Sequence, residues 1–193
     1  MAASDPAESD GRRRRSLDSR ARIVAAMLEL IREGEISPGA EQVAARAQVG
    51  LRTVFRHFKD MDSLYREMSA VIEGELRKVA LQPFKTDSWR ARVDELIERR
   101  SQAFERIAPF KRASEVHRHK SKFLEDDSSR LSQTLREILK NILPPEFSKE
   151  PLTLETVDLL LSYETWIRLR RDQNLTPRRA REVLLAAVRK VLD

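Results

Sequence analysis

Apolar residues recur at helical spacing along most of the chain, and no segment gives a convincing strand pattern. The first predicted helix runs from Leu17 to Glu33, with Ser16 as its cap and Gly34 just past its end. Its expected inner face holds Leu17, Ala21, Val24, Ala25, Leu28 and Ile31. Further helices are predicted over 39–47, 51–58, 88–107, 109–120, 122–143 and 153–173, together with one that Asp60 caps and a last one that Thr176 opens. The chain is therefore expected to be all-α.

The predicted helices fall into two groups, preceded by a polar segment. Residues 1–16 contain almost nothing to bury and end in four consecutive arginines, so we expect a disordered, arginine-rich arm. A break at 82–87, which contains Pro83, separates a domain over 17–80 from a second helical domain over 82–193.

Composition excludes several classes of protein. The chain has five glycines, none beyond Gly74, so it lacks the glycine-rich loops that bind nucleotides. It has no cysteine, which excludes disulfides, thiolate zinc sites and a cysteine nucleophile and fits a reducing compartment. No local signature of nucleophilic or metal catalysis is present. We therefore expect no enzyme, no cofactor and no metal. Without a long apolar run or a secretory signal, we expect a cytoplasmic protein with no membrane partner.

Positive charge is concentrated near the N-terminus. The net charge is +6, and residues 11–60 carry eleven basic and six acidic side chains. This balance favours an anionic partner.

Two short helices, 39–47 and 51–58, are joined by the three residues Gln48, Val49 and Gly50, which predicts a helix-turn-helix. The second of these helices is expected to expose side chains suited to phosphates and to base edges. A small helical hairpin with a solvated polar face is the plainer alternative, and the arginine run has the same alternative as a solvated tail. The candidate DNA contacts are Arg52, Thr53, Phe55, Arg56, His57 and Lys59, with Arg14 and Arg15 from the arm.

Residues 43–64, VAARAQVGLRTVFRHFKDMDSL, resemble the DNA-binding signature of the tetracycline-repressor (TetR) family, roughly I-A-x-x-A-G-V-S-x-x-T-L-Y-x-H-F-x-S-K-E-x-L. Four positions depart from it. Gln48 stands at the turn glycine, which predicts a left-handed backbone there. Gly50 replaces the capping serine, Phe55 the tyrosine, and Met61 the lysine that begins the fourth helix.

The resemblance implies a homeodomain-like three-helix unit followed by a TetR-type helical bundle that binds a ligand and forms a homodimer. It also implies a repressor that binds a palindromic operator in double-stranded DNA and is released by a small-molecule effector. An alternative is a basic DNA-architectural or partner-binding protein without sequence choice or effector control. Competition between a palindromic site and random DNA distinguishes the two.

Aromatic residues of the second domain are candidates for the ligand pocket, with ordinary core packing as the alternative. The helix predicted over 153–173 is apolar around a wide arc, which favours burial on two sides, although a fully buried helix of the monomer has the same pattern. The pocket candidates are Trp89, Phe104, Phe110, His117, Phe123, Tyr163 and Trp166, and the candidates for the dimer interface are Leu161, Trp166, Val183, Leu184, Ala187 and Val188.

Overall fold

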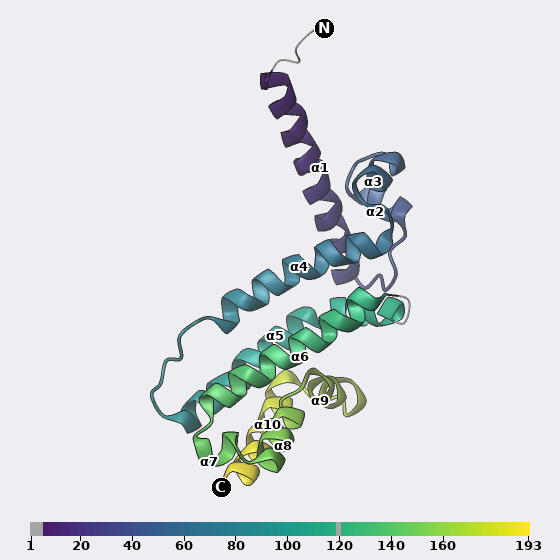
Figure 1. Ribbon diagram of the computed structural model, residues 1–193. Helices are drawn as coiled ribbons and strands as arrows, with labels where there is room; N and C mark the ends of the chain where they lie inside the picture. Colours follow the sequence, from purple (N-terminus) through teal and green to yellow (C-terminus); the bar gives the residue numbers. More distant parts are fainter. Residues whose placement is uncertain (1–5, 119–120) are drawn as a thin grey trace. The chain divides into compact units, whose positions relative to one another are not determined.

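The computed structural model describes residues 6–118 and 121–193, without the side chains of residues 6–13, 117, 118, 122, 125, 127 and 128. Every regular element in these ranges is helical, so the predicted all-α fold is confirmed. The elements are α1 (Pro6–Arg32), α2 (Ala40–Arg46), α3 (Leu51–His57), α4 (Met61–Ala80), α5 (Trp89–Arg118), α6 (Lys122–Ile142), α7 (Pro145–Ser148), α8 (Pro151–Leu160), α9 (Tyr163–Ile167), a π-helix η1 (Arg168–Asp172) and α10 (Pro177–Leu192) (Figure 1).

The first helix begins at Pro6, before its predicted start at Leu17. The expectation of a disordered arm over residues 1–16 is therefore wrong from Pro6 onward, while residues 1–5 lie outside the described part. Proline is favoured at the first helical position, and alanine, glutamate and arginine have high helix propensity. The acidic residues Glu8 and Asp10 stand near the positive end of the helix dipole. Helix propensity, the proline at the first position and the helix dipole therefore all favour an earlier start of the helix.

Two other helix boundaries differ from the prediction. Pro109 lies inside the continuous helix α5, where a break was expected. Conversely, the helix expected over 153–173 ends at Leu160, and a new helix starts after Ser162. The Ser162 hydroxyl accepts a hydrogen bond from the backbone N–H of Thr165 at 3.1 Å, which caps α9. The first of these helices begins at Pro151 and is capped by Glu150, ahead of the predicted start at residue 153.

Contacts group the helices into two compact units, and each is made from two stretches of chain. Unit 1 comprises Met1–Ile72 and Pro109–Leu124, and unit 2 comprises Glu73–Ala108 and Glu125–Asp193. The contact boundary thus falls inside α4, and the end of α5 joins unit 1. Independent folding of residues 17–80 stays a prediction.

In unit 1, α1 packs against α2 and α3, and these three helices share a core with the first half of α4. On α1 the buried face includes Ile23 and Met27, whereas Leu17, Ala21 and Ala25 of the predicted inner face are exposed. The packed part of α1 therefore begins near Ile23. The main core residues are Ile23, Met27, Ile31, Val43, Val54, Phe58, Leu64, Tyr65 and Met68, whereas Val71 of α4 is exposed.

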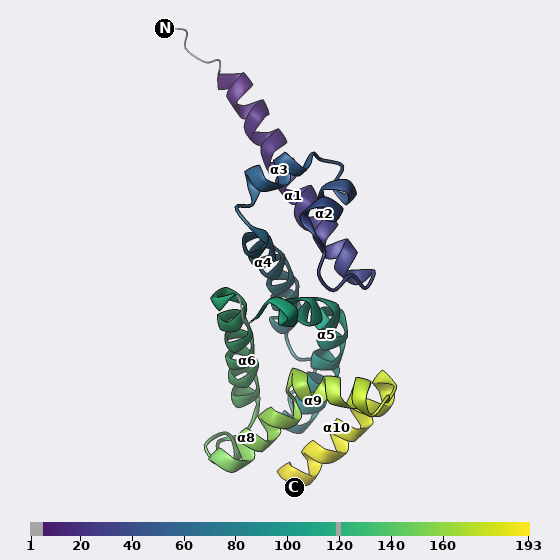
Figure 2. The ribbon, with the colours of Figure 1, turned by 90° about the vertical axis from the view of Figure 1, so that its right-hand side faces the viewer.

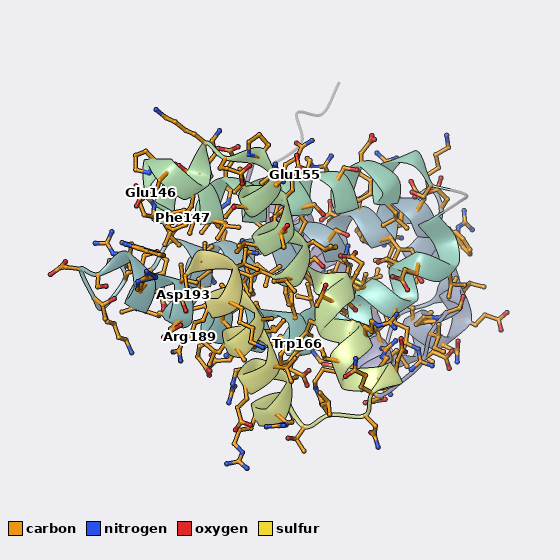
Figure 3. All side chains as sticks on the ribbon, turned by 90° about the horizontal axis from the view of Figure 1, so that it is seen from below. Glu146, Phe147, Glu155, Trp166, Arg189 and Asp193 are labelled. Carbon is orange, nitrogen blue, oxygen red and sulfur yellow. The ribbon has the colours of Figure 1, made fainter. Side chains whose placement is uncertain are left out.

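In unit 2, the side chain of Trp166, which Figure 3 labels, is fully buried. The indole Nε1–H donates to the Glu105 carboxylate at 2.9 Å. The Arg170 guanidinium donates to the same carboxylate through Nε at 2.8 Å and through Nη2 at 3.2 Å. Glu105 of α5 therefore joins α9 to the π-helix that follows it.

Arg100 of α5 fills a second buried position in unit 2. Its Nη1 donates to the Leu161 carbonyl at 3.0 Å, and its Nη2 donates to the Leu135 carbonyl. Burial lowers the pKa of this guanidinium to about 10, because desolvation disfavours the charged form. Leu161 is the C-cap of α8, so the positive charge lies where a helix dipole is negative and supplies a donor to a helix-end carbonyl. Arg100 thus holds the α8–α9 corner against α5.

Glu105 makes the stability of unit 2 sensitive to acid. The hydrogen bond from Arg170, and then that from Trp166, hold its pKa below the usual 4.5. A carboxyl with a lowered folded-state pKa stabilises fully above the unfolded value and loses this contribution as pH falls through the folded value. Glu105→Gln should therefore lower the free energy of unfolding by about 1 kcal/mol at pH 7, a value reduced for the partial exposure of the carboxylate. The difference from the unmodified protein should shrink below pH 4.5 in urea titrations, and a difference that stays constant with pH would contradict the assignment.

Candidate nucleic-acid interface

The turn between α2 and α3 has the backbone conformation that the sequence predicts. Gln48 has a φ of 54°, in the left-handed region. Its N–H donates to the Ala45 carbonyl at 3.2 Å, and the Val49 N–H donates to the Ala44 carbonyl at 3.0 Å. These two bonds form a Schellman motif, which ends α2 and turns the chain sharply toward α3. The predicted left-handed conformation of Gln48 is confirmed.

Replacing Gln48 by glycine should stabilise the protein. Glycine adopts positive φ without the steric cost that a Cβ imposes, which offsets its greater flexibility in the unfolded chain. We expect a gain of about 0.5–1 kcal/mol in the free energy of unfolding. Gln48→Ala is the control, because alanine removes the same side chain but keeps the Cβ. An equal gain in both variants would contradict the backbone explanation.

Gly50 is the N-cap of α3, with extended backbone angles and no side chain to accept a hydrogen bond. Its carbonyl still accepts from the Thr53 N–H at 2.8 Å. Val54 and Phe58 face the core. Together, the turn and this short buried stripe fix which face of α3 is presented to solvent.

The exposed face of α3 carries most of the predicted DNA contacts. Arg52 and Arg56 are exposed and stand four residues apart, so they lie on one side of the helix. Phe55 is 51% exposed between them, which leaves a large apolar ring in solvent. Thr53 is half-buried, and Lys59 is exposed just after the helix. Five of the six predicted residues around α3 are thus accessible on or beside this face.

His57 is the member of the predicted set that differs. Its Nε2 atom is buried, and no described residue forms a hydrogen bond with it. Burial lowers the pKa of this imidazole, and the positive charges of Arg56 and Arg20 lower it further. His57 as a whole is half-buried, so its role as a DNA contact stays a prediction.

Arg20 of α1 was not among the predicted site residues, yet it fixes the end of α3. Its Nη1 donates to the His57 carbonyl at 2.8 Å, and its Nη2 pairs with the Glu67 carboxylate at 2.7 Å. The guanidinium also stacks over the Phe58 ring, 4.5 Å from its centroid. In the sequence, the sole signal for Arg20 is its position one turn before Ile23, where the packed part of α1 begins.

Several basic residues of unit 1 are neutralised by acidic neighbours. Such pairs hold the side chain to the protein and reduce the charge that it offers to a ligand. The ion pairs are Arg20–Glu67 at 2.7 Å, Arg46–Glu33 at 2.6 Å and Arg66–Asp62 at 2.9 Å.

The basic residues on and beside α3 differ from these paired residues in having exposed charge. They are Arg52, Arg56 and Lys59. Within the described residues, none of the three forms an ion pair or a side-chain hydrogen bond. Like charges at positions i and i+4 of a helix destabilise it slightly, so Arg52 and Arg56 gain nothing in the isolated chain. The result is an exposed helix face with unpaired positive charge.

The predicted pocket residues are divided between the two units, and a ligand pocket stays a prediction. Phe110 and Phe123 belong to unit 1, where they pack under Arg32 and Arg66, respectively. In unit 2, the Phe104 and Tyr163 rings meet edge to face with centroids 5.6 Å apart, Trp89 stacks near Phe147 at 5.4 Å, and Trp166 binds Glu105. The side chain of His117 lies outside the described residues. Every described member of the set is thus engaged in packing.

Most of the predicted dimer residues are covered within the single chain. Leu161, Trp166, Leu184 and Val188 are buried, while Val183 and Ala187 of α10 are half-buried. The exposed apolar residues nearby in sequence are Leu152 and Leu159 of α8, which are 74% and 66% exposed. They are seven residues apart, so they share one face of the helix, and α8 packs on α10.

Among the described side chains, no group of three or more histidines or carboxylates is placed to hold a metal ion. The same part of the chain contains no helix with the length and hydropathy needed to span a bilayer.

The fold and this surface define a helix-turn-helix protein, in which a short exposed helix is supported by α1, α2 and α4. Among solved structures, the chain is similar to a TetR-family transcriptional regulator from Haemophilus influenzae RD, with 18% sequence identity, a TM-score of 0.40 and 97% of each chain covered. No family profile and no curated protein matches the chain. The roles of individual residues therefore have to be argued from its own side chains.

Proposed function

We propose that the protein is a sequence-specific DNA-binding transcriptional regulator that places α3 in the major groove. The observation that supports this best is the unpaired positive charge of Arg52, Arg56 and Lys59 on and beside an exposed helix of a helix-turn-helix. Helices presented in this way fit the width of the major groove, where base edges carry a distinct pattern for each base pair.

Each exposed side chain of α3 suits one kind of contact. Arg52 and Arg56 supply planar, forked donors that match the O6 and N7 acceptors of guanine. Phe55 offers an apolar surface for a thymine methyl group, and Thr53 a hydroxyl for a base edge or a phosphate. Lys59 beyond the helix suits the backbone and would add affinity at every sequence alike.

A homodimer is part of the proposal, because one short helix reads few base pairs. Two copies related by a two-fold axis present two recognition helices about 34 Å apart, which matches successive major grooves and a palindromic operator. The exposed Leu152 and Leu159 of α8, with the half-buried Val183 and Ala187 of α10, are apolar residues that such a partner could cover.

The regulatory part of the proposal is that the bound protein represses transcription in the cytoplasm and is released by a small-molecule effector bound in residues 82–193. It rests on the resemblance of residues 43–64 to TetR-family regulators and on the presence of a separate helical unit. An effector must favour one arrangement of the two recognition helices over another in order to change DNA affinity.

Selection from a pool of random duplexes tests the proposal without knowledge of the target genes. The expected product is a palindromic consensus with half-sites one helical turn apart, bound by a particle of twice the chain mass in light scattering. A pool that stays random after repeated rounds would support the architectural alternative instead.

A further inference from the structure

The N-terminal part of α1 extends well beyond the core of unit 1. Ile23 is the first buried residue among the described side chains of this helix, which begins at Pro6. At 1.5 Å per residue, the overhang before Ile23 is about 25 Å long. Both ribbon views show it projecting past α2 and α3 (Figures 1 and 2). Within the overhang, Arg20 contacts α3 and α4, whereas residues 14–18 are exposed.

The overhang is basic and exposed. Arg14 and Arg22 lie in solvent and form no ion pair with a described residue, and Arg15 is exposed beside them. The sequence of the overhang has six arginines and three acidic residues, Glu8, Asp10 and Asp18. Leu17 is 59% exposed, so the helix is not held there by burial. Its charge therefore exceeds what the chain itself neutralises.

The overhang continues directly from the proposed recognition surface. Arg20 joins α1 to the last carbonyl of α3, so the residues before Arg20 lead away from α3 itself. The recognition helix has seven residues and is about 10 Å long, shorter than the overhang. A protein that places α3 in a groove therefore carries a basic helix that reaches beyond the half-site.

We infer that the first part of α1 is a rigid second DNA-binding element, which contacts phosphates of the duplex flanking each half-site. This inference rests on the proposed function. It assigns a binding partner, the flanking DNA, to the overhang of α1, which lies outside the recognition helix α3. Because these residues form a helix, they cannot enter the minor groove as an extended arm. Its arginines neutralise phosphates instead, which adds affinity and salt dependence without sequence preference. With 3.4 Å per base pair, the reach corresponds to about 7 flanking base pairs.

The first test combines a charge variant with DNA length. In Arg14→Gln/Arg15→Gln, the slope of log K against log salt should fall by about 0.9 per arginine for each bound chain. Between 200 and 50 mM salt, the unmodified protein should gain about tenfold more affinity per bound chain than the variant. Trimming 10 flanking base pairs from each side of the selected duplex should weaken the unmodified protein more than the variant. Arg168→Gln/Arg171→Gln removes two exposed arginines from η1 and is the matched control.

The second test separates a rigid helix from a flexible arm. Ser19→Pro keeps every charge but breaks the helix between the arginines and the core, because proline removes the N–H of residue 19 and clashes with the carbonyl of Arg15. Ser19→Pro should show the same loss of affinity and of salt dependence as the charge variant, while Ser19→Ala should not. A full retention of affinity in Ser19→Pro, or equal trimming losses in the charge variant and the unmodified protein, would overturn the inference. A different result would contradict the proposed function itself, namely an unmodified protein that shows no preference for any duplex.

Discussion

Replacing Arg52 and Arg56 together by glutamine should abolish the preference of the protein for its selected DNA site. Each arginine that grips a base edge is expected to contribute about 1–3 kcal/mol of discrimination, so the pair corresponds to a loss of affinity of about thirtyfold or more. The residual binding should resemble binding to random DNA. Fluorescence anisotropy with a labelled duplex at fixed salt measures both quantities.

The fold should survive this double replacement, because both side chains are exposed and neither forms an ion pair with a described residue. Removing a like-charge pair at i and i+4 should leave the free energy of unfolding unchanged or raise it by a few tenths of a kcal/mol. Lys59→Gln is the informative companion, since it should weaken all sequences equally and reduce the salt slope by about 1. If the double variant still selected the same sequence, the proposal that α3 contacts the base edges would be wrong.

Replacing Trp166 by alanine should have the largest effect on stability, about 3–5 kcal/mol. The side chain is fully buried, so the substitution leaves a cavity among the helices of unit 2. It also deprives the Glu105 carboxylate of its indole donor. A loss of this size approaches the total stability of many domains, so the midpoint of urea unfolding should fall steeply.

The other tryptophan provides the control. Trp89 is half-buried and stacks near Phe147 and Arg90, so Trp89→Ala should cost distinctly less than Trp166→Ala. The effects of Trp166→Ala and Glu105→Gln should be non-additive, because both break one hydrogen bond. If Trp166→Ala left stability nearly unchanged, Trp166 would be free to line a pocket or an interface, as the sequence also allows.

Short-range chemistry made part of the fold predictable from the sequence. The last helix begins where Thr176 and Pro177 suggest, with the Thr176 hydroxyl accepting from the Arg179 N–H at 3.3 Å. Gly34 follows the first helix with a φ of 105°, as expected for a residue that ends a helix. Caps and left-handed turns depend on a few adjacent residues, and the sequence displays those directly.

Features that depend on distant parts of the chain were not predictable in the same way. Nothing local requires the helix expected over 153–173 to break at Ser162, where Arg100 from another helix holds the preceding carbonyl. A break was expected between the helices over 88–107 and 109–120, but α5 runs continuously through Pro109. The burial of the His57 Nε2 atom likewise depends on neighbouring elements and does not follow from the residue type.

The candidate site also combines features that adjacent residues determine with features that depend on distant parts of the chain. The residue types at Arg52, Arg56 and Lys59 were readable from the sequence, because their spacing follows a short helix after a three-residue turn. Among the described residues they lack acidic partners, while Arg20 and Arg46 have them, and this difference depends on which helices pack together. This difference separates a surface that is merely basic from one suited to bind an anion.

The most direct test of the central proposal is a competition titration. The protein is bound to a labelled duplex that carries the selected palindrome, and unlabelled palindrome or random DNA of equal length is added at 150 mM salt. A sequence-specific regulator should require at least about a thousandfold more random DNA than palindrome to displace half of the label. Displacement at equal concentrations of the two competitors would contradict the proposal and assign the basic surface to binding without sequence choice.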